Sequence, residues 1–213
     1  MTNWNPLTVW FWNKPYLRFP AVEYDPKNLD DRFVHLTNNS VAKYAKGATE
    51  FGIGNMWTSE MFAEYLKSEY KKDVWEEGGL WKQMQQVVID TLLGVQDMFD
   101  EAKTQGVHVE LYGFDLLVDN DCKPWLIEVN SSPTMEYSTG ITEVLCKKVM
   151  EDTIKVIVDY HFASNKKKPS IDTGDWERIY ASGTVVEKML SCFGENFECV
   201  GKKMKIWKAG KGY

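Results

Sequence analysis

Residues 110–134 read ELYGFDLLVDNDCKPWLIEVNSSPT, and this segment determines how the rest of the chain is interpreted. Two apolar runs, residues 109–118 and 125–130, flank a polar stretch at 119–123, which predicts two strands joined by a tight turn. With the turn centred on Asp121-Cys122, Asp115 faces Glu128 and Val118 faces Trp125. Because strand side chains alternate with a period of two, Asn130 lies on the same face as Glu128.

The predicted register places two carboxylates and an amide oxygen together within otherwise apolar strands. Like charges directly opposite each other destabilise a sheet, and burying them without a partner costs more. A divalent cation removes this conflict, and hard oxygen ligands of this kind suit Mg²⁺, which usually also contacts substrate phosphates. The hairpin therefore predicts a metal–nucleotide site. A surface hairpin with solvated acids remains an alternative at this point, because the register depends on the chosen turn centre.

Composition bounds the class of protein. The chain has 213 residues, 44% hydrophobic and 14% aromatic, which is typical of a globular domain with a substantial core. The formal net charge of -6 argues against a general nucleic-acid binder. Residues 201–213 contain five lysines and no acid. Such a run suits contact with an acidic partner surface, but a solvated terminus is the more common explanation.

The four cysteines show no CxxC pairing and no histidine at ligand spacing, so we expect free thiols in a reducing compartment rather than a zinc site or disulfide framework. The sequence contains neither a signal peptide nor an apolar run long enough to span a membrane, so we expect a location in the cytoplasm or on the cytoskeleton.

The order of elements predicts an α+β fold with a mostly antiparallel sheet packed against long helices. Upstream of the hairpin at 109–130, we expect a hairpin of strands 7–12 and 16–19 around Asn13-Lys14-Pro15 and a short strand at 33–36. Helices are expected at 58–70, with Thr58 as N-cap and Met61, Phe62, Tyr65 and Leu66 facing inward, at 80–103, at 139–161 with Ser138 or Thr139 as cap, and at 183–192.

The hairpin is similar to the metal-binding hairpin of ATP-grasp ligases of the tubulin tyrosine ligase-like family. Three more segments support the resemblance: residues 5–19, a strand pair that ends near Arg18; residues 34–40, VHLTNNS; and residues 171–180. Residues 55–62 and 130–135 resemble the glycylase branch more than the glutamylase branch. The likeness runs from about residue 5 to about residue 182, and the order and spacing of the segments are more specific than any one of them.

The resemblance implies a ligase that uses ATP and Mg²⁺. ATP would activate a glutamate side chain in the acidic tails of tubulin as an acyl phosphate, and free glycine would then attack it, which is tubulin glycylation. The expected partners are tubulin and microtubules, including those of the cilium or flagellum axoneme, with neither nucleic acid nor membrane.

The resemblance also assigns roles to residues. Asp115, Glu128 and Asn130 would hold the metal, with Asp115 and Glu128 also part of the nucleotide site, and Arg18 would clamp a phosphate or the acyl phosphate. Thr37 and Asn38 would lie near the nucleotide. The incoming amino acid would meet Asn39, Ser40 and Lys43, of which Asn39 and Lys43 have the i,i+4 spacing of one helix face.

In the family, the phosphate-binding lysines lie upstream of these segments, so residues 1–182 are expected to form the C-terminal portion of a catalytic domain. Residues 183–213 would add a short helix and a basic tail. Two alternatives remain open: the same chemistry with glutamate as the added amino acid, and an inactive half-domain that binds microtubules. A ligase for small molecules is disfavoured by the segments quoted above.

Overall fold

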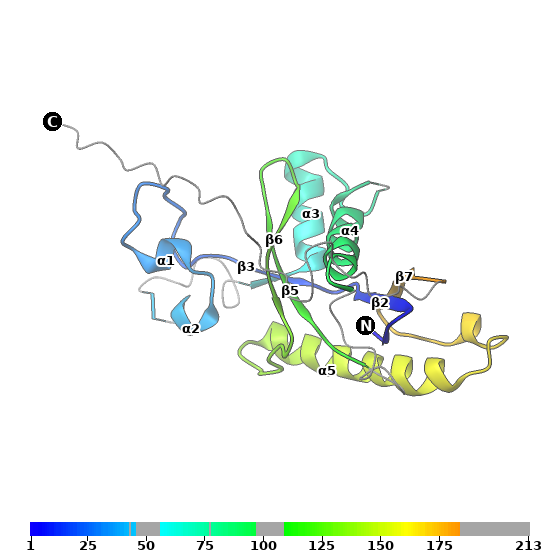
Figure 1. Cartoon of the computed structure of the whole chain (residues 1–213). Coiled ribbons are helices and arrows are strands. Elements are labelled where there is room, and N and C mark those ends of the chain that lie inside the picture. The colour runs from blue at the N-terminus through cyan, green and yellow to red at the C-terminus, as the bar shows by residue number, and fades with distance from the viewer. Residues whose placement is uncertain (43, 46–55, 77, 97–108, 184–213) are drawn as a thin grey trace, which may run out of the picture.

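The computed structural model describes residues 1–42, 44–45, 56–76, 78–96 and 109–183. It is a mixture of helices and antiparallel strands, which confirms the α+β class (Figure 1). The strands are β1 (Asn3–Trp4), β2 (Leu7–Trp12), β3 (Tyr16–Arg18), β4 (Met56–Thr58), β5 (Gly113–Val118), β6 (Pro124–Asn130) and β7 (Trp176–Ala181). The helices are α1 (Arg32–His35), α2 (Asn39–Ala42), α3 (Ser59–Tyr70), α4 (Leu80–Leu93), α5 (Gly140–Ile154), the π-helical η4 (Lys155–Tyr160) and the 3-10 helix η5 (Lys168–Ser170).

The strands form three small antiparallel sheets rather than one. β2 lies between β1 and β7, β3 pairs with β4, and β5 pairs with β6. In Figure 1 the β5–β6 hairpin stands at the centre, with α1 and α2 on one side and β7 on the other. No helix among the described residues is long and apolar enough to cross a membrane.

The predicted hairpin between residues 7–12 and 16–19 is wrong, although both strands exist. β2 pairs with β7, more than 160 residues later, and the backbone of Asn13 extends this pairing with a 2.9 Å bond to the carbonyl of Asp175. The chain therefore runs on through Lys14 and Pro15 to a different sheet instead of turning back. β7 itself was not expected from the sequence.

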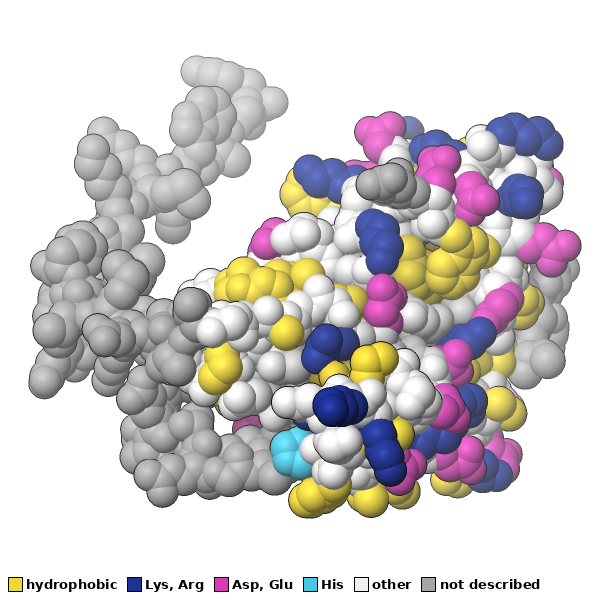
Figure 2. All heavy atoms as spheres, turned by 90° about the vertical axis from the view of Figure 1, so that its right-hand side faces the viewer, with side chains coloured by type: hydrophobic (Ala, Val, Ile, Leu, Met, Phe, Trp, Pro, Cys, Tyr) yellow, Lys and Arg dark blue, Asp and Glu magenta, His cyan; other side chains and the backbone are white. Residues whose placement is uncertain are grey.

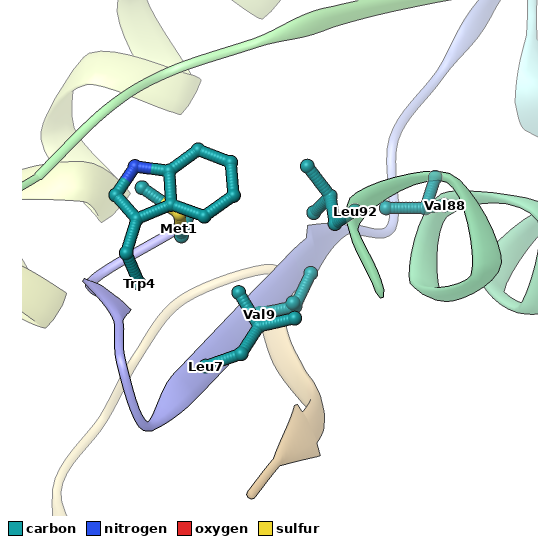
Figure 3. Packing of buried hydrophobic residues seen from close by; sticks show 6 residues of the cluster. All are labelled: Met1, Trp4, Leu7, Val9, Val88 and Leu92. Atoms are coloured by element: carbon teal, nitrogen blue, oxygen red, sulfur yellow. The ribbon is translucent and has the colours of Figure 1, made fainter. Parts of the chain in front are cut away.

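One buried apolar cluster fixes β1 and β2 on α4. Met1, Trp4, Leu7 and Val9 meet Val88 and Leu92 (Figure 3), and Phe114 of β5 packs at its edge. Leu7 and Val9 are almost completely buried. Full burial of such a side chain contributes about 1.5–3 kcal/mol, so this cluster is a main source of stability.

A second cluster anchors the turn of the β5–β6 hairpin. Leu66 of α3 packs with Val74, Leu80 and Trp81, and the hairpin contributes Val118 and Cys122 to its edge. The end of the hairpin opposite to Asn130 is thereby held against α3 and α4.

The helix caps follow the sequence closely. Thr58 caps α3 by accepting a bond from the backbone of Met61, and Thr139 caps α5 in a reciprocal capping box with Thr142. The path of α5 continues through η4 to residue 162, as predicted. On α3, Leu66 is buried, but Met61 and Tyr65 are exposed rather than inward.

Other helix predictions need correction. Residues 33–36 were expected as a strand, but Arg32–His35 is α1, because the Asp31 side chain caps the backbone of Phe33 at 2.9 Å. α4 begins as expected and stops at Leu93 before Gly94, since glycine is a poor helix former. The predicted remainder at 97–103, and the predicted helix and basic tail at 184–213, lie outside the described residues.

A buried carboxylate ties α5 to β2 and to the turn before β7. Asp152 is fully buried and lies 2.6 Å from the Lys148 ammonium and 3.4 Å from that of Lys155. It also accepts bonds from the indole of Trp12 (3.3 Å) and the backbone of Asp175 (3.0 Å). Burial alone would raise the pKa of Asp152, but the bonds from Lys148, Asp175 and Trp12 outweigh it and hold this pKa below its usual value.

Gly174 supplies the backbone shape that brings this turn onto Asp152. Its φ of +61° favours glycine, and a Cβ there would lie 1.9 Å from Asp152 Oδ1. We expect Gly174→Ala to lower the free energy of unfolding by about 2–3 kcal/mol in urea titrations. Gly140→Ala is the matched control, because a Cβ there meets open space and should change stability by less than about 1 kcal/mol. Equal effects of both variants would contradict this role of Gly174.

The low pKa of Asp152 also predicts the acid sensitivity of the fold. A carboxylate with a lowered native pKa stabilises the fold above its unfolded pKa, near 3.9, and this stabilisation is lost as the pH falls through the native pKa. Asp152→Asn should therefore be less stable at neutral pH and lose less stability on acidification, as measured by thermal unfolding at a series of pH values. Asp159→Asn, an exposed change on η4, should keep the acid dependence of the original chain.

Candidate functional site

The β5–β6 hairpin places Asp115 directly opposite Glu128, as the sequence predicts. The register on the turn side is different, because Val118 pairs with Pro124 and not with Trp125. A β-bulge between Asp115 and Leu116 adds one residue on β6 and restores the predicted pairing from Glu128 to Asn130. The predicted turn centre was therefore wrong by half a residue. The bulge shifts the register by one residue, so the predicted pairing of Asp115 with Glu128 is nevertheless observed.

Asn130 completes a three-residue group with the two acids. Its amide nitrogen donates to Glu128 Oε1 at 3.2 Å and lies 3.5 Å from Asp115 Oδ2. All three side chains are exposed, and so are the neighbouring Leu117 and Ile127, at 61% and 63%. Ligands can therefore reach the group from solvent. We call Asp115, Glu128 and Asn130 the acidic group.

The electrostatics of the acidic group show the conflict that the sequence anticipates. Partial burial raises the pKa of Asp115, and the hydrogen bond and negative charge of Glu128 raise it further. The positive charge of Arg18 acts in the opposite direction. The structure therefore brings Arg18, from a strand almost a hundred residues upstream, into the electrostatic neighbourhood of the acidic group.

Arg18 is oriented by a residue that the sequence analysis did not single out. Its guanidinium donates to the hydroxyl of Tyr16 at 2.6 Å and lies 5.2 Å from the centre of the Tyr16 ring. Tyr16 and Arg18 are two residues apart on β3, and the period-two rule for strands would have indicated a shared face. β3 is itself held by pairing with β4, where Arg18 is opposite Met56.

The segment 37–43 is only partly connected to the acidic group. Asn39, at the start of α2, donates to the backbone carbonyl of Ser138 at 3.5 Å, in the loop between β6 and α5. Thr37 and Asn38 lie in the link between α1 and α2, and Ser40 lies on α2. Within the described part of the chain, these three form no side-chain bond to the hairpin. Lys43 lies outside the described residues, so its predicted pairing with Asn39 is untested.

The acids of the turn have a structural role. Asp119 accepts bonds from the backbone of Asp121 and Lys123 and from the indole of Trp125. The bond from Trp125 and those from the backbone hold the pKa of Asp119 below its usual value. Asp119 therefore shapes the turn, as the sequence predicts, and its oxygens are already occupied.

The donor set of the acidic group fits a hard divalent cation. Two carboxylates and an amide oxygen match the ligands of Mg²⁺, provided that Asn130 turns its oxygen rather than its nitrogen toward the ion. A cation would also counteract the partial burial and the negative charge of Glu128 that raise the pKa of Asp115. No cluster of three or more His, Cys, Asp or Glu side chains suited to a metal occurs among the described residues, so this site would depend on the amide and on oxygens from a bound substrate.

Comparisons with known proteins identify the family of this chain. The family described as "Tubulin-tyrosine ligase family" matches residues 1–168. The chain belongs to this family. It is 41% identical over 212 residues to Tubulin glycylase 3C of Tetrahymena thermophila, which covers 98% of this chain and 19% of that protein.

Two vertebrate relatives give the same result. Protein monoglycylase TTLL8 of Mus musculus is 39% identical and Tubulin monoglycylase TTLL3 of Danio rerio 38% identical, each over 189 residues, which is 87% of this chain and 22% and 23% of those proteins. The chain thus spans about a fifth of the length of these relatives. Its similarity to the glycylase branch is confirmed.

The acidic group predicts a specific response to Mg²⁺. Asp115→Asn removes one of two facing charges, so without metal the variant should be more stable than the original chain, by up to about 1 kcal/mol. Millimolar MgCl₂ should raise the melting temperature of the original chain and not that of Asp115→Asn, because only the original binds the ion. Differential scanning calorimetry with and without MgCl₂ measures both effects.

Asp121→Asn is the matched control, because it makes the same change in the turn of the same hairpin. It should keep the response to MgCl₂. A metal response in Asp115→Asn equal to that of the original chain would rule out Asp115 as a ligand.

Proposed function

We propose that this chain is part of an ATP-dependent ligase that adds glycine to glutamate side chains of tubulin tails. The observation that carries the proposal is the facing pair Asp115 and Glu128, with Asn130 beside it and the Arg18 charge close by. The glycylase names of the relatives favour the reaction and tubulin as its substrate.

In this proposal the fold is of the ATP-grasp type, and the acidic group holds Mg²⁺ on the phosphates of ATP. The bound ion would neutralise negative charge as the terminal phosphoryl group moves to a glutamate carboxylate. Glycine's amine would then displace phosphate from the acyl phosphate and form an isopeptide bond. No side chain of this region needs to form a covalent bond with the substrate.

Arg18 is proposed to bind the phosphoryl group opposite the acids. A guanidinium donates two parallel bonds to phosphate oxygens, and the bond and ring contact with Tyr16 reduce the freedom it must lose on binding. Its attraction to Asp115 keeps it near the acidic group before substrate arrives. Thr37 and Asn38 are proposed to contact the nucleotide from the link between α1 and α2.

Asn39, Ser40 and Lys43 are proposed to hold the incoming glycine. Support comes from Asn39, whose bond to Ser138 places the start of α2 beside the loop that leaves the acidic group. The alternative donor is glutamate, as in a polyglutamylase. The glycylase names of the relatives favour glycine, and we propose action on microtubules, including those of the axoneme.

A second candidate function is binding to microtubules without catalysis. Leu117 and Ile127, beside the acidic group, expose apolar surface that another part of a protein could cover. Such a surface favours a role in binding. The complete set of proposed ligands on the hairpin favours the ligase.

The direct test is incorporation of labelled glycine into microtubules by the full-length protein with ATP and MgCl₂, with labelled glutamate in parallel. We expect incorporation of glycine and a loss of at least about 100-fold in Glu128→Gln, because the charge that holds the ion is removed. Glu136→Gln, an exposed change of the same kind beyond β6, should retain activity. Incorporation of glutamate would assign the protein to the other branch, and microtubule binding without incorporation would favour the binding function.

A further inference from the structure

A groove lies away from the acidic group, where β2 and β7 meet the end of η4 and the segment that contains η5. It has a volume of about 630 Å³, within the range of pockets that hold ligands. Its walls include Trp10, Tyr160, Lys168, Ile171, Trp176 and Arg178. In Figure 1 this region lies on the side of β7, whereas α1, α2 and β3 lie on the other side of the hairpin.

Two cations share one aromatic ring in this groove. The Lys168 ammonium lies 5.3 Å and the Arg178 guanidinium 5.9 Å from the centre of the Tyr160 ring. Arg178 also donates to the Tyr160 hydroxyl at 2.7 Å. The ring offsets part of the repulsion between the two cations, and an anion bound between them would offset more.

Neither cation forms an ion pair with a carboxylate of the described residues. Two nearby acids are already engaged elsewhere. Glu177, which also lines the groove, binds Lys82 at 3.3 Å and Gln85 at 2.8 Å on α4. Asp172 pairs with Lys155 at 2.8 Å. The groove therefore has positive charge available for an anionic ligand.

The shape of the groove is set by its aromatic residues. The Trp10 ring packs edge-on against Tyr160, with centres 4.9 Å apart. Tyr160 is the last residue of the π-helical turn η4, and such turns are uncommon and frequently occur at functional sites. Figure 2 faces this side of the molecule and shows Lys and Arg side chains next to hydrophobic ones, with Asp and Glu side chains among them. Aromatic and aliphatic side chains beside two cations suit a ligand with aliphatic stems and terminal carboxylates.

We propose that this groove binds a glutamate-rich peptide segment, at a place separate from the acidic group. Carboxylates would lie between Lys168 and Arg178, and the methylenes of glutamate side chains would lie against Trp10, Ile171 and Trp176. The inference rests on the proposed function only for the identity of the peptide, because the acidic tail of the proposed protein substrate is a glutamate-rich segment. Such a groove would bind one part of the tail and thereby raise the local concentration of the reacting glutamate at the acidic group.

Fluorescence anisotropy of a labelled, glutamate-rich peptide tests the groove without ATP, MgCl₂ or glycine, so its outcome is independent of ligase activity. We expect saturable binding that weakens as salt rises toward about 0.15 M, because exposed charges are screened. Lys168→Glu should weaken binding at least fivefold, and a peptide with glutamine in place of glutamate should not bind. Arg178→Gln should also weaken binding.

Lys67→Glu is the matched control, because it makes the same charge change at an exposed position on α3. It should retain affinity within twofold. Equal loss in Lys67→Glu and Lys168→Glu would overturn the proposal, as would tighter binding of a single-stranded RNA than of the peptide. Hydrogen exchange measured with and without the peptide should show protection at residues 160–178, and protection confined to the hairpin would also overturn it.

Discussion

Two carboxylates held directly opposite each other, Asp115 on β5 and Glu128 on β6, are the constraint on which the proposed function depends. Sheet pairs of like charge cost stability. Here partial burial, with the hydrogen bond and the negative charge of Glu128, raises the pKa of Asp115. The β-bulge on the turn side of this pair sets which residues of β6 face Asp115. Without the extra residue, Asp115 would face Ile127, and the acidic group would not form.

The remainder of the fold holds this strained pair in place from several directions. The turn of the hairpin is anchored by Val118 and Cys122 in the cluster around Trp81, and Phe114 packs against the cluster of β1, β2 and α4. Beyond Asn130, the chain leads to the Thr139 cap of α5, and α5 is tied to β2 through Asp152. The chain runs on from β2 into β3, which pairs with β4 in a separate sheet and carries Arg18.

Local signals in the sequence predicted local structure well. Thr58 was identified as a cap, and Thr139 was one of two candidates for the cap of α5. β2 begins and ends at the predicted residues 7 and 12. Long-range pairing was not predictable, because the partner of β2 is β7 and nothing in residues 7–19 points to it. The expected pairing of Asp115 with Glu128 was right although the centre of the turn was misplaced. The β-bulge that restores this pairing was not predictable, because no glycine in residues 114–118 or 124–130 marks its position. The helix at Arg32–His35 was missed because Asp31 was read as part of a loop rather than as a cap.

The part of the candidate site that lies on the β5–β6 hairpin was predictable from the sequence. Contacts between segments that are distant in the sequence were less predictable. The alternation of side chains was enough to group Glu128 with Asn130, and the same rule could have found Tyr16 beside Arg18. Contacts such as Asn39 with Ser138 depend on tertiary folding across about a hundred residues and leave no local pattern.

The most direct test of the central claim is a crystal structure with Mn²⁺ and a non-hydrolysable ATP analogue, using anomalous scattering to locate the metal. Mn²⁺ takes the same oxygen ligands as Mg²⁺, at about 2.0–2.3 Å. The account predicts a peak coordinated by both Asp115 and Glu128, with the oxygen of Asn130 turned toward it. A peak elsewhere, for example on Asp119 and Asp121 in the turn, or phosphates bound without metal at the acidic group, would contradict it.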